Sequence, residues 1–331
     1  RTAMSVLVRM AEVYGADELM DVSQAHIDGC GLMSDAGLEF AEKLAAAGGK
    51  VVVPTTLNMG PLDLQDWRRF VSDETFAAKA IRQGKAYTDM GCVPTWSCAP
   101  YQGYLTPRFG QQIAWGESNA ICYANSVLGA RTNRYADYLD ICAAIAGRVP
   151  KCGLHLTENR RGRWLLNLVD FPESLLAEEV FWPVLGHLVG GMVHDTIPVI
   201  TGVPTTANDD QLKAFAAAAA SAGSMALFHA VGVTPEAPTV EAALQNRPPE
   251  RTSDIRPEDW YRAWDDLAAA AEGEKLDVVV LGCPHLSFAE FRSLVEAVRQ
   301  AAPARAAEGV DVVLLTCQQS LSLVDRTDWL A

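Results

Sequence analysis

Three of the eight cysteines stand where a metal ligand could lie. Cys98 is in a turn between prolines, and Cys283 and Cys317 each follow an apolar run that predicts a buried strand. Thiolates in such loops can bind an iron–sulfur cluster, and three of them leave one iron open to a substrate. Because no two cysteines have the close spacing of a ligand motif, ordinary cysteines at strand ends are the alternative interpretation.

Residues 93–134 concentrate polar side chains next to small residues, and loops of this kind are where binding usually takes place. The candidates are Ser97, Glu117, Asn125, Ser126, Arg131, Thr132 and Arg134. Arginine binds a carboxylate through two parallel hydrogen bonds, so Arg131 and Arg134 predict a locally basic site. The alternative is a capped helix and a solvated loop, with both arginines complementing the helix dipole.

Further polar groups follow predicted strands at 19–22, 51–53 and 225–229. They are His26 after the first strand, Thr55, Thr56 and Asn58 after the second, and His229 at the end of the third. In open parallel sheets the crevice outside the carboxyl ends of the strands holds the ligand. These groups are therefore predicted to face a common cleft, although a histidine that caps a turn is the alternative for His26.

Helices and strands alternate along the chain, which predicts mostly parallel sheets. The helical periods cover 3–14, 35–48, 67–84, 86–90, 111–128, 138–147, 173–192, 208–222, 257–271 and 287–300. The other predicted strands are 152–157, 199–200, 278–281 and 310–315, and residues 236–262 are predicted to form a surface excursion. We expect a three-layer α/β fold in two lobes, residues 1–192 and 193–331.

The composition limits the classes of function. The chain has 331 residues, of which 49% are hydrophobic and 21% charged, enough for two packed lobes. Its formal net charge of −14 disfavours nucleic acid and anionic membranes as partners. No apolar run reaches the ~18 residues of a membrane span. Scattered cysteines without secretory features indicate reduced thiols and a cytoplasmic protein. Because the chain opens at Arg1 inside a helical pattern, we expect natural residues upstream.

Six segments resemble the aconitase X family, in its large catalytic part. They are PTWSCAPY (94–101), PRFGQQIAWGES (107–118), YANSVLGARTNR (123–134), SQAHIDG (23–29), VPTTLN (53–58) and LGCPH (281–285). The resemblance extends from about residue 3 to about residue 330 and implies aconitase-like catalytic domains. It also implies a hydro-lyase, since bacterial members resemble cis-3-hydroxy-L-proline dehydratases and archaeal ones include mevalonate 5-phosphate dehydratases.

We therefore expect dehydration of cis-3-hydroxy-L-proline to Δ1-pyrroline-2-carboxylate. An alanine-rich composition typical of bacteria favours this substrate, as does the absence of a glycine-rich phosphate cradle in the sequence. The alternatives are mevalonate 5-phosphate dehydration and a non-catalytic aconitase-like binding subunit.

The resemblance also implies roles for the candidate residues. The family binds an iron–sulfur cluster, [2Fe–2S] or [4Fe–4S], or mononuclear iron through cysteines. Cys98 and Cys283 match its cysteine motifs. A third family cysteine falls in a segment that this chain does not contain, so Cys317 either replaces it or is a core residue.

The remaining roles concern a small carboxylate substrate and its protons. The implied substrate-binding set is Thr55, Thr56, Asn58, Ser97, Asn125, Ser126, Arg131, Thr132 and Arg134. His26, Glu117 and His229 are the candidate acids for the departing water. The base that takes the α-hydrogen is expected on a small swivelling domain or subunit of the same enzyme, absent from this chain.

Overall fold

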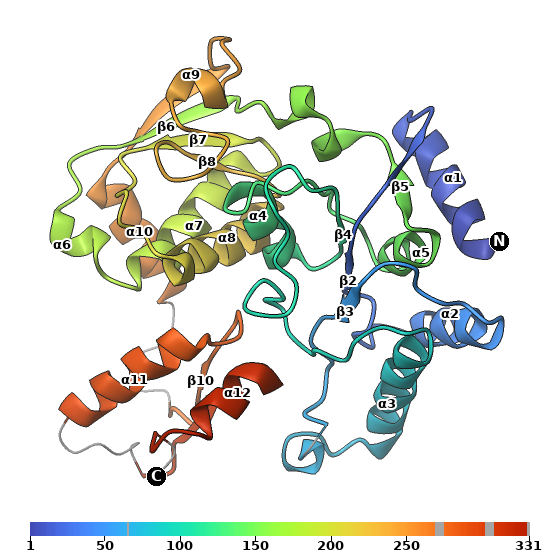
Figure 1. Ribbon diagram of the computed structural model, residues 1–331. Coiled ribbons are helices and arrows are strands. Elements are labelled where there is room, and N and C mark those ends of the chain that lie inside the picture. Colours follow the sequence, from blue (N-terminus) through green and yellow to red (C-terminus); the bar gives the residue numbers. More distant parts are fainter. Residues whose placement is uncertain (65, 269–274, 302–307, 330–331) are drawn as a thin grey trace.

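The computed structural model describes residues 1–64, 66–268, 275–301 and 308–329 (Figure 1). Parallel strand pairs make up three of the sheets, and one further pair, β1 (Leu19–Asp21) with β5 (Arg148–Pro150), is antiparallel. The prediction of an α/β fold with mostly parallel sheets is confirmed. None of the helices that the structure describes has the length and apolar character needed to cross a bilayer.

The first unit is built on the parallel sheet β3 (Thr55–Leu57), β2 (Ala25–Ile27) and β4 (Ala114–Trp115), in that order. Helix α5 (Leu139–Ala146) packs on β2 and β4 and on α1 (Thr2–Tyr14), while α2 (Asp35–Ala46) packs on α3 (Glu74–Asp89). Figure 1 shows these helices around the three short strands. One apolar cluster, which includes Leu7, Ile27, Tyr87 and Ile141, fills the space between them.

The second unit is built on the parallel sheet β8 (His229–Ala230), β7 (Pro198–Thr201), β6 (Trp164–Leu168) and β9 (Arg251–Ile255). Helices α7 (Phe181–Val193) and α8 (Asp209–Gly223) pack closely on each other, and α4 (Ser118–Ser126) and α10 (Pro257–Leu267) pack on this pair. The short helices α6 (Glu173–Leu176) and α9 (Val240–Ala243) lie in its connections. A second apolar cluster combines Trp115 of β4 and α4, the helix that directly follows β4 in the first unit, with α7 and α8, so the two units share a core.

A third unit pairs β10 (Val278–Leu281) with β11 (Asp311–Leu314) in parallel. Helices α11 (Phe288–Gln300) and α12 (Gln318–Val324) contact each other beside these strands. In Figure 1 this orange-to-red unit lies below the second unit. The three parallel sheets therefore define three units, where the sequence predicted two lobes.

The predicted lobe boundary at residue 192 falls inside the second unit. Strand β6 pairs with β7 and β9, so residues 164–168 belong to the same sheet as residues 198–201 and 251–255. The sequence analysis divided the unit because it did not predict β6, so no residues before 192 were expected in the same sheet as residues 198–201.

Several predicted elements differ from the structure. The segment 111–128, predicted as one helix, contains β4, a turn at Gly116 and α4. Because β4 has only two residues, it shows hardly any alternation of apolar and polar side chains, and the apolar residues of the whole segment fit a helical period. The predicted strand 51–53 is displaced to β3, and the 152–157 segment forms 3₁₀ turns at 153–155 and 157–160. Residues 236–262 contain β9, a strand of the core sheet, rather than only a surface excursion.

The predicted helix 257–271 is observed as α10 up to Leu267, and its positions 269–271 lie outside the described residues. The strand predicted at 278–281 has the same bounds as β10. Local signals were sufficient there because an apolar β-branched run is followed directly by a Gly-Cys-Pro turn.

Candidate active site at the Cys98 and Cys283 loops

Two cysteine-bearing loops meet between the first and third units. The backbone N–H of His285 donates a hydrogen bond to the Cys98 thiol sulfur over 3.2 Å, although the two residues are 187 positions apart. Cys98 is buried, while Cys283, two residues before His285, is exposed. The amide of Asn119 holds the carbonyl of Cys98 at 3.0 Å, which anchors this loop on α4. The two predicted ligand loops are therefore in contact.

Glu117 lies beside this pair of loops, at the carboxyl end of β4. It is the N-cap of α4, and its carboxylate accepts a hydrogen bond from the Ala120 N–H. Burial raises the pKa of the Glu117 carboxyl to about 7, and the charge of Asp28 adds to the rise. Burial and then the charge of Glu117 raise the pKa of the Cys98 thiol to about 12. Glu117 thus carries its proton over part of the neutral range.

Asp28 and Asn58 follow the carboxyl ends of β2 and β3 and bind each other. The Asn58 amide donates to the Asp28 carboxylate, and Oδ1 of Asn58 has no hydrogen-bond partner among the described residues. Burial raises the pKa of Asp28 above its usual range, while the Asn58 hydrogen bond opposes that rise. Glu117, Asp28 and Asn58 all follow neighbouring strands of one parallel sheet, where ligand sites of such sheets form.

Asp140 supports this edge of the sheet, and the sequence analysis missed it. It is fully buried in the first turn of α5, and Oδ2 accepts from the backbone N–H groups of Asp28 at 2.7 Å and Gly29 at 3.2 Å. Burial raises its pKa to about 7. An aspartate in the first turn of a helix is ordinary, so its sequence position gave no signal.

Gly116 shows how closely these groups approach. A Cβ at this position would lie 2.9 Å from Oδ2 of Asp140 and 2.9 Å from Cβ of Asp28. A side chain on residue 116 would therefore displace the Asp28 loop from β4, which explains a glycine between the strand and Glu117.

His26, Thr56 and Thr55 lie inside the first sheet. The His26 ring is fully buried, and its Nδ1 is 2.8 Å from the Thr56 hydroxyl. Burial lowers the pKa of His26 to about 3, so the ring is neutral near neutral pH and has no proton to spare as an acid. The Thr55 hydroxyl donates to the Val53 carbonyl at 2.8 Å. The structure places all three as supports of the strands.

Asn125, Ser126 and Thr132 hold the end of α4 to its surroundings. The Asn125 amide donates to the carbonyls of Thr132 and Ala226 and accepts from Thr132 N–H and Arg160, which uses both donors and both acceptor positions. The Ser126 hydroxyl accepts from the Phe228 N–H. The Thr132 hydroxyl accepts from the Trp115 N–H and donates to Asn133 O. The hydrogen bonds of these buried side chains are therefore made within the protein.

The two predicted clamp arginines are separated by the structure. Arg131 pairs with Gln112 before β4, and its guanidinium donates to His155 O at 3.2 Å and the Thr157 hydroxyl at 2.8 Å. Since Glu117 follows the carboxyl end of β4, Arg131 lies toward the opposite end of that strand.

Arg134 is exposed, and its charge lies close to Cys122 on the buried face of α4, where it opposes the burial that raises the pKa of that thiol to about 12. Glu117 caps the same helix, so Arg134 is the predicted arginine whose charge acts on a residue of the helix that Glu117 begins.

The remaining predicted residues have local partners. The Ser97 hydroxyl is buried and accepts from the Ala99 N–H, which closes the turn that carries Cys98. His229 is buried at the start of β8, where Nε2 lies 2.7 Å from the Arg160 carbonyl, and burial lowers its pKa. Cys317 is buried at the start of α12, with its sulfur 3.6 Å from the Ser320 hydroxyl. This placement is that of a packed cysteine at the end of a strand.

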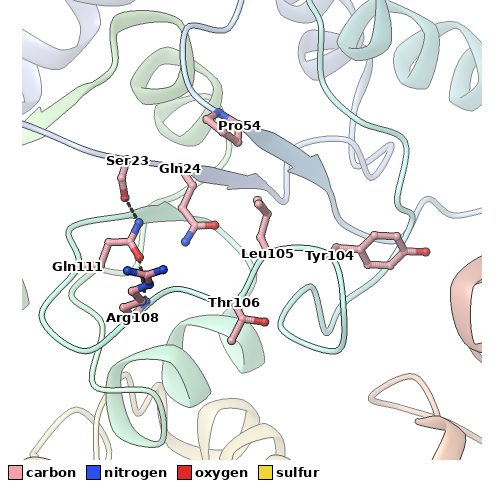
Figure 2. Close-up of a pocket in the computed structure, with 8 residues that line it drawn as sticks. All are labelled: Ser23, Gln24, Pro54, Tyr104, Leu105, Thr106, Arg108 and Gln111. Atoms are coloured by element: carbon pink, nitrogen blue, oxygen red, sulfur yellow. Dashed lines mark hydrogen bonds between the residues drawn. The ribbon is translucent and has the colours of Figure 1, made fainter.

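A cavity of about 580 Å³ opens at the other end of the first sheet (Figure 2). Its lining residues are Ser23, Gln24, Pro54, Tyr104, Leu105, Thr106, Arg108 and Gln111. Ser23 and Gln24 precede β2 and Pro54 precedes β3, so the cavity lies at the amino ends of these strands. Asp28 is four extended residues beyond Gln24, roughly 13 Å along the strand. The cavity and the candidate site therefore occupy different ends of the sheet.

The thiols of Cys98 and Cys283 have the donor chemistry of iron–sulfur cluster ligands. Cys98 and Cys283 are on adjoining loops, and thiolates are the donors that such clusters use. Within the described ranges, no three His, Cys, Asp or Glu side chains converge on a point that could hold a metal ion. The donor type fits a cluster, and the described part of the chain brings two cysteine loops together, where such a cluster takes three or four cysteines.

Comparison with known proteins agrees with this geometry. Models of the aconitase X first domain and of the aconitase X second domain match residues 1–158 and 166–265. The chain belongs to the aconitase X family. The gap between the two matches coincides with the start of the second unit, before β6.

Individual relatives support the same family. The chain is 44% identical to a cis-3-hydroxy-L-proline dehydratase from Pseudomonas aeruginosa, over 89% of this chain and 50% of that protein. It is 39% identical to a phosphomevalonate dehydratase large subunit from Methanothermobacter thermautotrophicus, over 91% of this chain and 73% of the relative.

A solved structure has the same fold. The crystal structure of Thermococcus kodakaraensis aconitase X (holo-form) superposes with a TM-score of 0.88 at 30% identity, over 99% of this chain and 79% of that one. The chain spans about half the length of the Pseudomonas protein that it matches.

Proposed function

We propose that this chain is the catalytic part of a hydro-lyase that dehydrates cis-3-hydroxy-L-proline to Δ1-pyrroline-2-carboxylate. The observation that carries the proposal is the contact of the Cys98 thiol with the 283–285 loop beside the protonatable Glu117. The bacterial relative at 44% identity, which is named for this reaction, supports the choice of substrate.

Cys98 and Cys283 are the residues that would hold an iron–sulfur cluster or iron. When bound, iron with an open coordination position supplies Lewis acidity for the leaving hydroxyl. The Cys98 sulfur must lose its proton before it can bind a metal, and the N–H of His285 favours the thiolate. Cys317, with its buried placement, is assigned to packing.

Glu117 is the proposed general acid. Its carboxyl group holds a proton near neutral pH because it is buried, and it lies close enough to Cys98 for its charge to affect that thiol. A proton delivered from Glu117 to the departing hydroxyl releases water, and burial keeps the competing solvent away. Asp28 and Asn58 line the same edge, where the buried Oδ1 of Asn58 has no hydrogen-bond partner among the described residues and could accept a bond from a substrate that enters the site.

Arg134 is the proposed partner of the substrate carboxylate. Arg134 is exposed, its charge acts on Cys122 of α4, and its planar guanidinium fork matches a carboxylate. We assign Arg131 to the His155 and Thr157 contacts instead. Thr55, Thr56, Ser97, Asn125, Ser126 and Thr132 act by holding their loops, and His26 and His229 act as neutral packed rings.

We also propose a small swivelling domain or subunit as the source of the base for the α-hydrogen. The name of the Methanothermobacter relative, a large subunit, supports a divided enzyme of this kind. A reducing compartment, the cytoplasm, suits the proposal because the eight cysteines are all free thiols in the structure.

The test uses the complete enzyme that contains this chain, purified without oxygen. We expect bound iron with acid-labile sulfide, and conversion of cis-3-hydroxy-L-proline to Δ1-pyrroline-2-carboxylate followed by NMR. Mevalonate 5-phosphate is the comparison substrate, since the Methanothermobacter relative at 39% identity is named a phosphomevalonate dehydratase large subunit. Turnover of the phosphate substrate alone would move the assignment to the second activity, and absence of both iron and turnover would contradict the proposed function.

A further inference from the structure

Lys213 on α8 is a buried lysine at the place where the two cysteine loops meet. Its side chain is 1% exposed. The ammonium group pairs with Asp210 at 3.0 Å and with Glu290, and it donates to the carbonyl of His285 at 3.3 Å. An ammonium has three N–H donors, so these three partners use all of them.

The Lys213–Asp210 pair connects three segments that are far apart in the sequence, and Asp210 supplies the contact with one of them. Asp210 also accepts from the Gln102 amide at 3.3 Å and from the Ser287 hydroxyl at 2.8 Å. Gln102 is on the Cys98 loop, and Ser287 with Glu290 begins α11 after the Cys283 loop. The buried Lys213 therefore joins α8 to the Cys283 loop directly, and its partner Asp210 joins α8 to the Cys98 loop through Gln102.

The backbone of His285 is held at both its N–H and its carbonyl group. Its N–H donates to the Cys98 sulfur, and its carbonyl accepts from Lys213. The position of this backbone fixes how the residues before it, Pro284 and Cys283, approach Cys98. Burying a lysine with two carboxylates is expensive and adds little stability by itself, so a role in geometry accounts better for it.

We propose that Lys213 is a positioning residue that sets the arrangement of the Cys98 and Cys283 loops. It acts through the His285 backbone and does not touch the substrate. This role deepens the proposed function. Its effect on iron binding rests on that function, whereas the arrangement of the two loops can be measured in the metal-free protein.

The experiment measures alkylation of each cysteine by iodoacetamide in chelator-treated enzyme, resolved by mass spectrometry. In the unaltered protein we expect Cys98 to react slowly, because it is buried and bonded to the His285 N–H. Loss of the Lys213 charge raises the pKa of the Cys98 thiol and slows alkylation, so rates are compared after correction for their pH dependence. The corrected rate at Cys98 should rise in Lys213→Met by about 10-fold or more, the factor that loss of a hydrogen bond to a charged group gives. Cys122 and Cys142, packed on α4 and α5, should keep their rates.

Two further variants separate positioning from a general loss of stability. The triple variant Lys213→Met, Asp210→Asn and Glu290→Gln removes the hydrogen bond to the His285 carbonyl without leaving buried carboxylates unpaired. In this variant Cys98 should react as fast as in Lys213→Met alone. Glu236→Gln breaks a different buried ion pair, Arg160–Glu236, and should leave the rate at Cys98 unchanged.

Each outcome decides the proposal. Unchanged protection of Cys98 in Lys213→Met, a parallel rise at Cys122 and Cys142, or recovery of protection in the triple variant would overturn it. A rise confined to Cys98, with lower iron retention after reloading, supports it. If Cys98 becomes reactive but the unaltered enzyme binds no iron, the positioning role stands and the proposed function fails.

Discussion

Cys98 and Cys142 show that the surroundings of a buried thiol decide whether it is a candidate metal ligand. Both are buried, but Cys98 is in a loop that contacts the Cys283 loop, whereas Cys142 is on the packed face of α5. Thiols on a helical face have no second donor from another loop beside them. The difference between a ligand and a core cysteine is therefore one of contacts, and it leads to a direct test.

We expect Cys98→Ala and Cys283→Ala each to lose the bound iron and the dehydratase activity of the complete enzyme together, because each removes a thiolate ligand. Cys142→Ala is the matched control and should retain both. Iron and sulfide analysis beside an activity assay provides the measurement. If Cys142→Ala lost iron to the same extent, destabilisation rather than ligand loss would explain all three variants.

Glu117 predicts a pH dependence of stability whose sign follows from its raised pKa. The folded protein binds this proton more tightly than the unfolded chain, so the stabilisation is present below the ordinary pKa of 4.5 and is lost as the pH rises through about 7. Glu117→Gln keeps an oxygen for the Ala120 N–H but cannot ionise. We expect urea unfolding to show a smaller loss of stability between about pH 5 and about pH 8 in this variant than in the unaltered protein.

Asp140→Asn is the companion variant, since its carboxyl pKa is also raised to about 7 by burial. Asp140→Asn should reduce the loss of stability over the same pH range, and the double variant with Glu117→Gln should reduce it further. Identical pH dependence in Glu117→Gln and the unaltered protein would show that Glu117 is ionised throughout this range.

At the scale of single residues, the sequence was informative about loops and uninformative about partners. The proximity of the Cys98 and GCPH motifs followed from their positions at turns and strand ends. The saturation of Asn125 by four protein groups did not, because Arg160 and Ala226 are distant in the sequence. A buried structural amide and a substrate-binding amide look the same until their neighbours are known.

Among the helices and strands, α7 and α8 make the closest contact described above. Gly190 on α7 faces the backbone of α8, and a Cβ on it would lie 2.5 Å from the Ala219 carbonyl oxygen and 2.8 Å from the Ala219 Cα. Gly223 approaches Gly190 even more closely, so the two helices meet backbone to backbone. The next residue, Gly191, has open space around the same position and is exposed.

These neighbours form a matched pair of substitutions. Gly190→Ala should destabilise the protein by about 1–3 kcal/mol, because backbone atoms cannot move aside easily. Gly191→Ala should stabilise it by about 0.5–1 kcal/mol, since alanine loses less conformational entropy in a helix. Urea unfolding of both variants measures the difference, and equal effects of the two would mean that the helices are farther apart than described.

Strand length explains most of the element-level errors of the sequence analysis. Strands β4 and β8 have two residues each, and β2 and β3 have three, which is too short for a period of two to stand out. Helix α8 was recognisable because it is 15 residues long and starts with an Asn208–Gln211 capping box. Long elements with caps can be predicted from the sequence, whereas the short strands that position the site cannot.

At the scale of the whole molecule, Arg160 joins the first unit to the second. Its side chain is fully buried, and it donates to the Asn125 side chain and carbonyl and to the Ala130 carbonyl on one side. On the other side it forms an ion pair with Glu236, in the loop after β8. It also lies between the two matched family domains, so the boundary of the domains is itself held by a buried charge.

This junction gives the last prediction. Arg160→Met leaves Glu236 with a buried, unpaired carboxylate and removes the bonds to Asn125 and Ala130, which should cost about 3–5 kcal/mol. The double variant with Glu236→Gln should recover part of that loss, because no unpaired charge remains. As a control, Arg262→Met removes an exposed ion pair with Asp259, 72% and 37% exposed, and should cost less than about 1 kcal/mol.

The shape of the unfolding curve tests the same point more sharply. The second apolar cluster combines α4 of the first unit with α7 and α8 of the second, so the unaltered chain should unfold these units together. If Arg160 maintains this shared core, Arg160→Met should lower the urea midpoint of both units while keeping a single transition, followed by circular dichroism and tryptophan fluorescence. Two separate transitions would show that Arg160 itself, and not the shared apolar core, couples the units.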